Sequence, residues 1–403
     1  MTPETRQILD HFSRTAEQVV GEDAFVERLD SGRPLRIKYG VDCTAPDLHL
    51  GHAVNLWLMR YLQDRGHKVI FLLGDLTTRI GDPTDRSETR PVLTPAEIDR
   101  NAAAYLDQVT TVLRTDAELL EVRRNSEWLE PLGVGGLLEL LAMVTHRRLI
   151  ARDMFAARIE ADADIAGHEL VYPVLQGYDS VAIESDLTVV GTDQLYNEMM
   201  GRHYQQRFGQ QPQTVITTKI TPGLDGGPKQ SKSLGNYVGL TDSPEDKFGR
   251  LMRLLDELIE TYATIYADLP DDRVRELGAR AAQGGRAARD AKLDLAEAIV
   301  ARYHGTEVAA RERDRFLAVF SARELPADLP ELTVAQPVTT LIDLLRVARP
   351  AASRGELLRL IGQGGVAVNG ARITDPDAEL RPESGDVLKL GKRDRRRLVR
   401  PAG

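Results

Sequence analysis

Two histidines and a glycine form the first group of residues whose types and spacing suit chemistry. His49, Gly51 and His52 follow the apolar run Leu35–Val41 and open a stretch with helical periodicity. A helix N-terminus binds anions, because its first N–H groups are unpaired and carry partial positive charge. Gly51 allows a ligand close to the backbone, and histidines three residues apart can face one ligand. The pattern suits hydrogen bonds to nucleotide phosphates.

Two lysines and two serines form the second group, in a loop flanked by glycines. Lys229, Ser231, Lys232 and Ser233 could close over a triphosphate, with ammonium groups neutralising it and hydroxyls donating hydrogen bonds. Taken alone, this run is more typical of a solvated polar loop, and the histidine pair is more typical of a surface or a metal site. No third metal ligand of matching spacing accompanies the histidines, so we expect no protein-bound metal.

A third group lies between the first two in the chain. Tyr172, Gln176 and Asp179 occupy positions i, i+4 and i+7, which share one face of a helix. A carboxylate on an otherwise apolar helix face is costly unless it has a partner, and a phenol hydroxyl would be one. The alternative is a tyrosine packed in the core and an aspartate bonded locally.

The elements that must position these groups alternate between apolar runs and helical patterns. Thr94, Pro95 and Glu97 resemble a helix N-cap, a proline at the first helical position and a capping-box acid. Such alternation predicts an α/β fold, a doubly wound parallel sheet with helices on both faces. The expected strands are Leu35–Val41, Val69–Leu73, Asp186–Gly191 and Gln213–Ile220, and the expected helices are His52–Gly66, Thr94–Arg114 and Gln194–Phe208.

Beyond this sheet, the pattern changes twice. Helical periodicity runs from Ser243 to Ala322, and a proline-containing stretch with few large apolar residues then reads as a linker. A small α+β unit follows, with helices at 341–347 and 353–362 and strands at 366–370 and 386–390. The expected domains are 1–225, 226–325 and 338–403, with 326–337 as the linker.

Composition and charge limit the function classes. Cys43 is the only cysteine among 403 residues, which excludes an intrachain disulfide and a cysteine-based zinc site. No apolar run is long enough to cross a bilayer and no signal peptide is visible, so we expect a cytoplasmic protein. The net charge is −9, but residues 337–403 carry 13 Lys/Arg against 8 Asp/Glu. That basic end suggests a polyanion contact, or a solvated tail.

Over nearly its whole length the chain resembles the bacterial tyrosyl-tRNA synthetases, which are class I aminoacyl-tRNA synthetases. His49–His52 and Lys229–Ser233 match the HIGH and KMSKS signatures of that class. Further matching segments are Tyr39–His52, Ile80–Thr84, Tyr172–Asp179 and Gly191–Gln194. The resemblance implies a Rossmann-type catalytic domain in 1–225 with a dimer-forming insertion, a helical tRNA-binding domain in 226–325, and a C-terminal alpha-L RNA-binding domain.

The resemblance also implies roles for single residues. Catalysis would fall to His49, His52, Lys229, Lys232 and Thr44. Tyrosine would be bound by Asp82, Tyr172, Gln176, Asp179 and Gln194, with Asp179 accepting the phenol hydroxyl. ATP would be bound by Gly40, Asp42, Gly51, Asp193, Ser231 and Ser233.

The implied reaction joins L-tyrosine to ATP, supplied with Mg²⁺, and passes the tyrosyl group to the 3′ end of tRNA(Tyr). The implied assembly is a homodimer, with the segment 136–155 at the interface. Candidate RNA contacts in the C-terminal domain are Arg346, Arg354, Arg359 and Arg372.

Four departures from the family pattern concern the pocket and the loops. Cys43 stands where proline is usual, Gln230 where methionine is usual, and Asp85-Arg86 where glycine and lysine are common. Lys38 occupies the position of a second phenol-binding tyrosine in many members. These departures leave open a substituted tyrosine as substrate, or a synthetase-like enzyme with another acceptor. A non-catalytic RNA-binding protein would have lost the histidines or the lysines, and none is lost.

Overall fold

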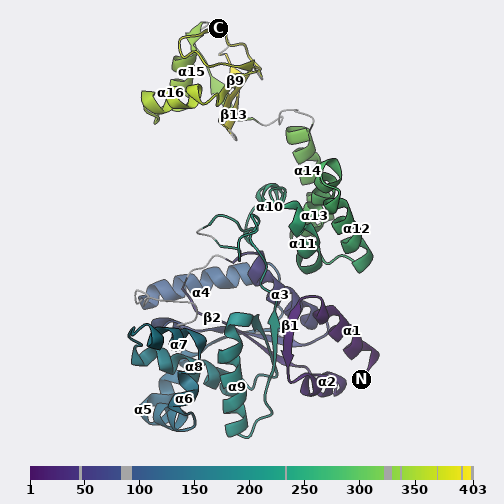
Figure 1. Ribbon diagram of the computed structural model, residues 1–403, viewed down its shortest axis with the longest axis vertical. Coiled ribbons are helices and arrows are strands. Elements are labelled where there is room, and N and C mark those ends of the chain that lie inside the picture. The colour runs from purple at the N-terminus through teal and green to yellow at the C-terminus, as the bar shows by residue number, and fades with distance from the viewer. Residues whose placement is uncertain are drawn as a thin grey trace. The chain divides into compact units, whose positions relative to one another are not determined.

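The chain divides into two compact units, Met1–Arg313 and Asp314–Gly403. The computed structural model (Figure 1) describes residues 1–44, 48–82, 93–231, 234–321, 329–335, 338–369, 371–391 and 394–400. Within these ranges, no helix has the length and apolar character needed to cross a membrane.

A six-stranded sheet forms the centre of the first unit, in the order β1-β6-β5-β2-β3-β4. Its strands are β1 (Ala16–Val20), β2 (Arg36–Val41), β3 (Lys68–Leu73), β4 (Leu120–Arg124), β5 (Leu187–Gly191) and β6 (Thr214–Thr218). All neighbours pair in parallel except β1, which runs antiparallel to β6. The sequence prediction of a wholly parallel sheet missed both edge strands, β1 and β4, because neither has a continuous apolar run.

The order of the strands reverses between β2 and β5, where a doubly wound sheet places its ligand crevice. β2 pairs with β3 over six positions. With β5 it pairs over two, Ile37 with Leu187 and Lys38 with Thr188. The two central strands therefore separate after Lys38, and a crevice opens toward their carboxyl ends.

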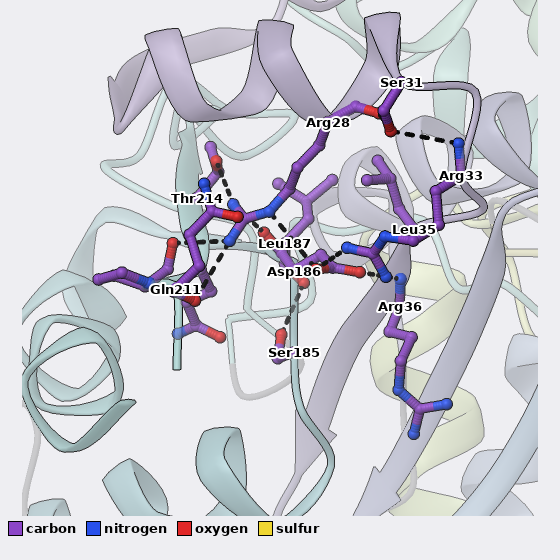
Figure 2. A network of polar contacts seen from close by, with 12 residues as sticks. Arg28, Ser31, Arg33, Leu35, Arg36, Ser185, Asp186, Leu187, Gln211 and Thr214 are labelled. Atoms are coloured by element: carbon purple, nitrogen blue, oxygen red, sulfur yellow. Dashed lines mark hydrogen bonds and ion pairs between the residues drawn. The ribbon is translucent and has the colours of Figure 1, made fainter. Parts of the chain in front are cut away.

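A network of polar contacts fixes the opposite ends of these strands (Figure 2). The buried guanidinium of Arg28 donates to the Asp186 carbonyl at 3.1 Å and to the carbonyls of Gln211 and Pro212. The Asp186 carboxylate accepts from the Arg33 guanidinium at 2.6 Å and from the Arg36 N–H at 2.9 Å. Buried polar groups are tolerated when they are hydrogen-bonded, as the groups of this network are. The network joins the amino ends of β2, β5 and β6.

Within the described residues, nine α-helices of the first unit precede its last sheet strand, β6. They are α1 (Pro3–Ser13), α2 (Glu22–Asp30), α3 (Leu50–Gln63), α4 (Pro95–Val109), α5 (Ser126–Ala142), α6 (His146–Leu149), α7 (Asp153–Glu160), α8 (Gly167–Ala182) and α9 (Leu195–Arg207). Residues of α3 and α4 share the main core with β2 and β3. α8 and α9 lie side by side and share a second core with α5 and α6 (Figure 1).

The start of α4 matches its sequence prediction and its end does not. Thr94 and Glu97 form the expected capping box, and Pro95 occupies the first turn. The helix ends at Val109, five residues before the predicted Arg114, and the chain continues in turns.

A run of helices follows the sheet. They are α10 (Pro244–Leu251), α11 (Ile259–Tyr266), α12 (Asp271–Ala282), α13 (Gly285–His304) and α14 (Thr306–Phe316). A glycine pair separates α12 from α13, and Gly284 and Gly285 adopt φ of 69° and 56°. Glycine takes this left-handed conformation without the Cβ penalty.

The second unit packs two helices against a five-stranded sheet of order β10-β9-β12-β13-β7, with β8 and β11 forming a separate pair. Its elements are β7 (Glu331–Thr333), β8 (Thr339–Thr340), α15 (Leu341–Ala348), α16 (Arg354–Gly362), β9 (Val366–Val368), β10 (Ala371–Arg372), β11 (Glu379–Leu380), β12 (Val387–Leu390) and β13 (Asp394–Val399). Both predicted helices and both predicted strands are present.

Three strands of this sheet, β7, β10 and β13, fall where the sequence suggested none. β7 lies inside the predicted linker and pairs in parallel with β13, with Leu332 buried in the core of the unit. β13 contains Arg395–Arg397 and pairs with β12. Within the basic end of the chain, Arg395–Arg397 therefore belong to a sheet and not to a solvated tail.

Candidate active site

A pocket of about 610 Å³ opens at the carboxyl ends of β2 and β5. Most of the residues expected from the sequence line it. They are Gly40, Asp42, Thr44, His49, Gly51, His52, Asp82, Tyr172, Gln176, Asp179, Asp193, Gln194 and Lys229. Ser231 is described but does not line the pocket. Lys232, Ser233, Asp85 and Arg86 lie outside the described residues.

The two histidines stand at the N-terminus of α3, with His49 as its N-cap. The Gly51 N–H donates to His49 Nδ1 at 3.2 Å, and the His49 N–H donates to His52 Nδ1 at 3.3 Å. Burial lowers the pKa of His49 to about 3 and that of His52 to about 4. Both rings are therefore neutral at pH 7. Since each Nδ1 accepts, each proton is on Nε2, where it can be donated to a ligand.

Gly51 is required by its contact with the first histidine. A Cβ at this position would lie 2.9 Å from His49 Cε1 and 3.0 Å from His49 Nδ1. The ring would have to move away from its place at the helix N-terminus. The glycine therefore sets the position of the imidazole as well as leaving space for a ligand.

The lysine-containing loop is joined directly to the histidine segment. The Leu50 N–H donates to the Val238 carbonyl at 3.0 Å, and the Leu240 N–H donates to the Leu48 carbonyl at 2.9 Å. His49 and Gly239 form an isolated antiparallel bridge. Segments about 190 positions apart in the sequence are thus paired, and His49 and Lys229 both line the pocket.

Two buried side chains hold the start of this loop. Gln230 donates to the hydroxyls of Tyr266, at 2.9 Å, and Thr221. Asn236 accepts from the Ser231 N–H at 2.8 Å and donates to the Lys229 carbonyl at 3.3 Å. Gln230, which replaces the usual methionine, therefore ties the loop to α11 through hydrogen bonds that a methionine could not make.

Asp179 lies at the closed end of the pocket on α8, where it is 3% exposed. Its carboxylate accepts from Trp128 Nε1 at 2.8 Å and more distantly from Asn125 Nδ2 at 3.4 Å. Burial raises the pKa of this carboxyl to about 7, opposed by the nearby Lys38 ammonium and by the two hydrogen bonds. The two donors come from the start of α5, so the aspartate is not bonded within its own helix.

Tyr172 and Gln176 extend this face of α8 toward the mouth of the pocket. The Tyr172 hydroxyl donates to Asp42 at 3.0 Å. Burial next to carboxylates raises the pKa of Tyr172 well above its ordinary value. Gln176 donates to Glu198 at 3.1 Å, and the side chain of Gln194 donates to Asp82 at 2.7 Å. These acceptors and donors surround one end of the pocket, where an amino acid could bind.

Sequence reasoning missed four residues of this end: Lys38 as a positive group, Glu198, Asn125 and Trp128. The Lys38 ammonium bonds Glu198 at 2.7 Å, and both side chains are buried. Thr77, also missed, donates to Asp42 at 2.9 Å. No sequence signal reveals that Lys38 and Glu198 are paired in the pocket, because their burial and their ion pair become visible only in the fold. No group of three or more His, Cys, Asp or Glu side chains suited to a metal occurs among the described residues.

The four arginines expected to contact RNA, Arg346, Arg354, Arg359 and Arg372, are all exposed on the second unit. Arg346 forms an ion pair with Asp343 at 3.3 Å. Exposed pairs of this kind are weak and easily exchanged for a phosphate.

Comparison with known families and proteins relates nearly the whole chain to one group of enzymes. Residues 30–321 match the family of class I tRNA synthetases of the W and Y type, and residues 340–388 match the S4 domain. The tyrosine–tRNA ligase of Moorella thermoacetica is 46% identical over 370 residues, 92% of this chain and 89% of that protein. The tyrosine–tRNA ligase of Oleidesulfovibrio alaskensis is 44% identical and covers 98% of both chains.

Solved structures share the fold. A truncated mitochondrial tyrosyl-tRNA synthetase from Aspergillus nidulans aligns with a TM-score of 0.63 at 22% identity, covering 78% of this chain and 94% of that one. A tyrosyl-tRNA synthetase from Archaeoglobus fulgidus, solved with L-tyrosine, aligns with a TM-score of 0.58 at 21% identity. The alignment covers 77% of this chain and 99% of that one.

Proposed function

Because this chain belongs to the class I tRNA synthetases of the tryptophanyl and tyrosyl type and is a tyrosine–tRNA ligase, we propose a site for each substrate in its large pocket. The enzyme activates L-tyrosine with ATP and transfers the tyrosyl group to tRNA(Tyr). Tyrosine binds between α8 and β2, with its phenol group at Asp179. ATP binds between the N-terminus of α3 and the loop containing Lys229.

The observation that carries this proposal is the shared wall of the pocket. The helix N-terminus with both histidines, the loop with Lys229 and the polar face of α8 all line the same cavity. Two substrates bound at its two ends would bring a carboxylate next to a triphosphate. Holding two reactants in this way removes much of the entropic cost of their reaction.

The roles at the tyrosine end follow from the hydrogen-bond capacity of each group. Asp179 accepts the phenol O–H. The α-ammonium group of tyrosine has three donors, which suit the acceptors Asp82, Tyr172 and Gln176. Gln194, already bonded to Asp82, lies near the carboxylate.

The nucleotide end uses the groups around α3 and β5. Asp193 and Gly40 contact the ribose, and Gly51 admits the nucleotide close to the backbone. Asp42 and Thr44 lie toward the phosphates, and Ser231 supports the closed loop. We place Ser233 and Lys232 in the same loop by sequence alone. Mg²⁺ arrives as the ATP complex.

The first reaction step needs no protein nucleophile. A carboxylate oxygen of tyrosine attacks the α-phosphorus and forms an O–P bond, while the bond from the α-phosphorus to the bridging oxygen breaks and pyrophosphate leaves with its electron pair. His49 and His52 donate hydrogen bonds from Nε2–H to oxygens that gain charge, and Lys229 neutralises the leaving pyrophosphate. Stabilisation of developing charge by fixed donors is the main contribution such a site can make. In the second step a ribose hydroxyl of the 3′-terminal adenosine of tRNA attacks the carbonyl carbon of the adenylate, an ester bond to tyrosine forms, and AMP leaves.

A homodimer also fits the first unit. The side chains of Val134 and Leu138 on α5 are 75% and 61% exposed. They lie at or next to the segment 136–155 expected as an interface, and two large apolar residues on one exposed helix favour a partner. The partner is a second copy of this chain. Sedimentation at micromolar concentration should show a dimer, and a monomer alone would contradict this assignment.

We further place the enzyme in the cytoplasm, because it charges tRNA for protein synthesis. Charging of total tRNA tests the acceptor directly. We expect tyrosine to be attached to one tRNA species. Adenylate formation without charging would favour a different acceptor.

A further inference from the structure

A buried lysine lies at the closed end of the tyrosine pocket, and the roles assigned above do not use it. Lys38 sits at the last position where β2 pairs with β5, and it is 2% exposed. Its ammonium group donates to Ser180 Oγ at 2.8 Å and forms an ion pair with Glu198 at 2.7 Å. A buried ammonium with these fixed partners has one position.

The ammonium group retains a donor. A lysine has three N–H donors, and Lys38 uses two of them within the described part of the chain. Lys38 also lines the pocket, as Asp179 does. The two residues are close enough for the ammonium to favour the ionised form of the carboxylate, and Ser180, bonded to Lys38, adjoins Asp179 in α8.

A phenol oxygen needs both kinds of partner. It donates one hydrogen bond and can accept another. Among the described residues, Asp179 accepts one short hydrogen bond, from Trp128 to Oδ1, and its Oδ2 has only the longer contact with Asn125. The carboxylate therefore has capacity to accept the phenol proton, and the adjacent ammonium has capacity to donate to the same oxygen.

We propose that Lys38 is a specificity-determining residue that donates its third N–H to the phenol oxygen of bound tyrosine, next to the Asp179 carboxylate that accepts the phenol proton. This inference rests on the proposed placement of tyrosine. It assigns to a cation the second contact with the hydroxyl. A ligand without a hydroxyl would therefore leave the third N–H of Lys38 and the acceptor capacity of Asp179 unused in a buried site.

A structural role for Lys38 makes a different prediction. Glu198 accepts from Lys38, from Gln176 at 3.1 Å and from Gln213 at 2.8 Å. Lys38 could matter only because it neutralises this buried carboxylate. In that case, removing both charges together would restore the pocket, whereas a contact with the phenol would still be lost.

Four proteins separate these roles: the wild type, Lys38→Met, Glu198→Gln and the double variant Lys38→Met/Glu198→Gln. The assay is ATP–pyrophosphate exchange with tyrosine and, separately, with phenylalanine. For Lys38→Met we expect kcat/KM for tyrosine to fall about 10- to 100-fold, mainly through KM, the range for loss of a hydrogen bond from a charged donor. The rate with phenylalanine should change far less, because phenylalanine has no oxygen to bond.

The double variant decides between the two roles. If Lys38→Met does not fold, the double variant still tests the contact with the phenol, because it leaves no unpaired charge at position 198. We expect it to keep the low kcat/KM for tyrosine and the reduced selectivity over phenylalanine. Recovery of wild-type selectivity in the double variant would overturn the proposal. An equal loss for both amino acids in every variant would also overturn it, because that result indicates a collapsed pocket.

Asp179→Asn in the same assay separates this inference from the proposed function. If Asp179→Asn lowers selectivity and Lys38→Met does not, tyrosine binds as placed and only the role of Lys38 is wrong. If neither variant changes selectivity, the phenol lies elsewhere and the placement of tyrosine is wrong as well.

Discussion

Replacing Asp179 with asparagine should change substrate selectivity and stability in opposite directions. The side chain keeps its shape, and its oxygen can still accept from Trp128 Nε1. The carboxylate oxygen near Asn125 becomes an NH₂ group, which cannot accept the phenol proton. The variant therefore loses one charge-assisted hydrogen bond to tyrosine without opening a cavity.

The loss for tyrosine follows from the strength of such a bond. A hydrogen bond to a charged group contributes about 1.5–3 kcal/mol, so kcat/KM for tyrosine should fall about 10- to 150-fold. Phenylalanine should be accepted better, since it no longer leaves a buried carboxylate unpaired. Tyrosyl enzymes as a class are known to reject phenylalanine by about 10⁵-fold, a value not calculated from this structure. We expect this ratio to fall by at least about 10-fold.

The gain in stability follows from the raised pKa. The carboxyl releases its proton near its ordinary pKa of 3.8 when unfolded and near 7 when folded. Between these values the folded state binds more protons, so ionised Asp179 destabilises the fold increasingly as pH rises. At about 1.4 kcal/mol per pH unit, the cost reaches as much as about 4 kcal/mol above pH 7. Asp179→Asn should therefore be more stable than wild type at pH 8 and about equal at pH 4.

Pyrophosphate exchange with both amino acids measures the first effect, and urea unfolding at pH 4 and pH 8 measures the second. The matched control is Asp256→Asn, the same chemical change at an exposed carboxylate that pairs with Lys292 and does not line the pocket. This control should leave selectivity unchanged. A variant at position 179 that loses both stability and tyrosine affinity would refute the reasoning, because Asp179 would then be a structural residue.

Three further predictions concern the same pocket. As pH falls below about 7, kcat/KM for tyrosine should decline about tenfold per pH unit, because Asp179 becomes protonated, and Asp179→Asn should remove this dependence. Gly51→Ala should lower kcat about 10- to 100-fold by displacing His49, while thermal unfolding shows no loss of stability, since alanine favours the helix. Lys229→Ala should lower kcat about 10²- to 10³-fold with little change in the KM for tyrosine, and an equal loss in both would contradict its role at the phosphates.

The sequence predicts the elements whose signals are local. α3 has apolar periodicity within a single segment, and the capping box of α4 spans four residues. The expected site residues that line the pocket belong to short motifs, whereas Glu198 and Thr77, which belong to none, were missed. β1 and β13 were not predicted. β1 has no continuous apolar run, β13 is mostly charged, and each pairs with a strand distant or adjacent in the chain, β6 and β12 respectively.

The electrostatics of the pocket depend on contacts between distant segments, which no local pattern encodes. Lys38 and Glu198 are 160 positions apart and form an ion pair at 2.7 Å. Trp128 and Asp179 meet across α5 and α8 at 2.8 Å. The sequence identified Lys38 as unusual, but only the fold shows that it is buried next to the carboxylate expected to bind the phenol.

Pyrophosphate exchange over the twenty standard amino acids tests the central claim most directly. The proposed site contains a hydroxyl-binding pair at the closed end of the pocket and acceptors for an ammonium group nearer its mouth. We therefore predict rapid exchange with tyrosine and almost none with phenylalanine or the other eighteen. Faster exchange with any other amino acid, or none with tyrosine, would contradict the account.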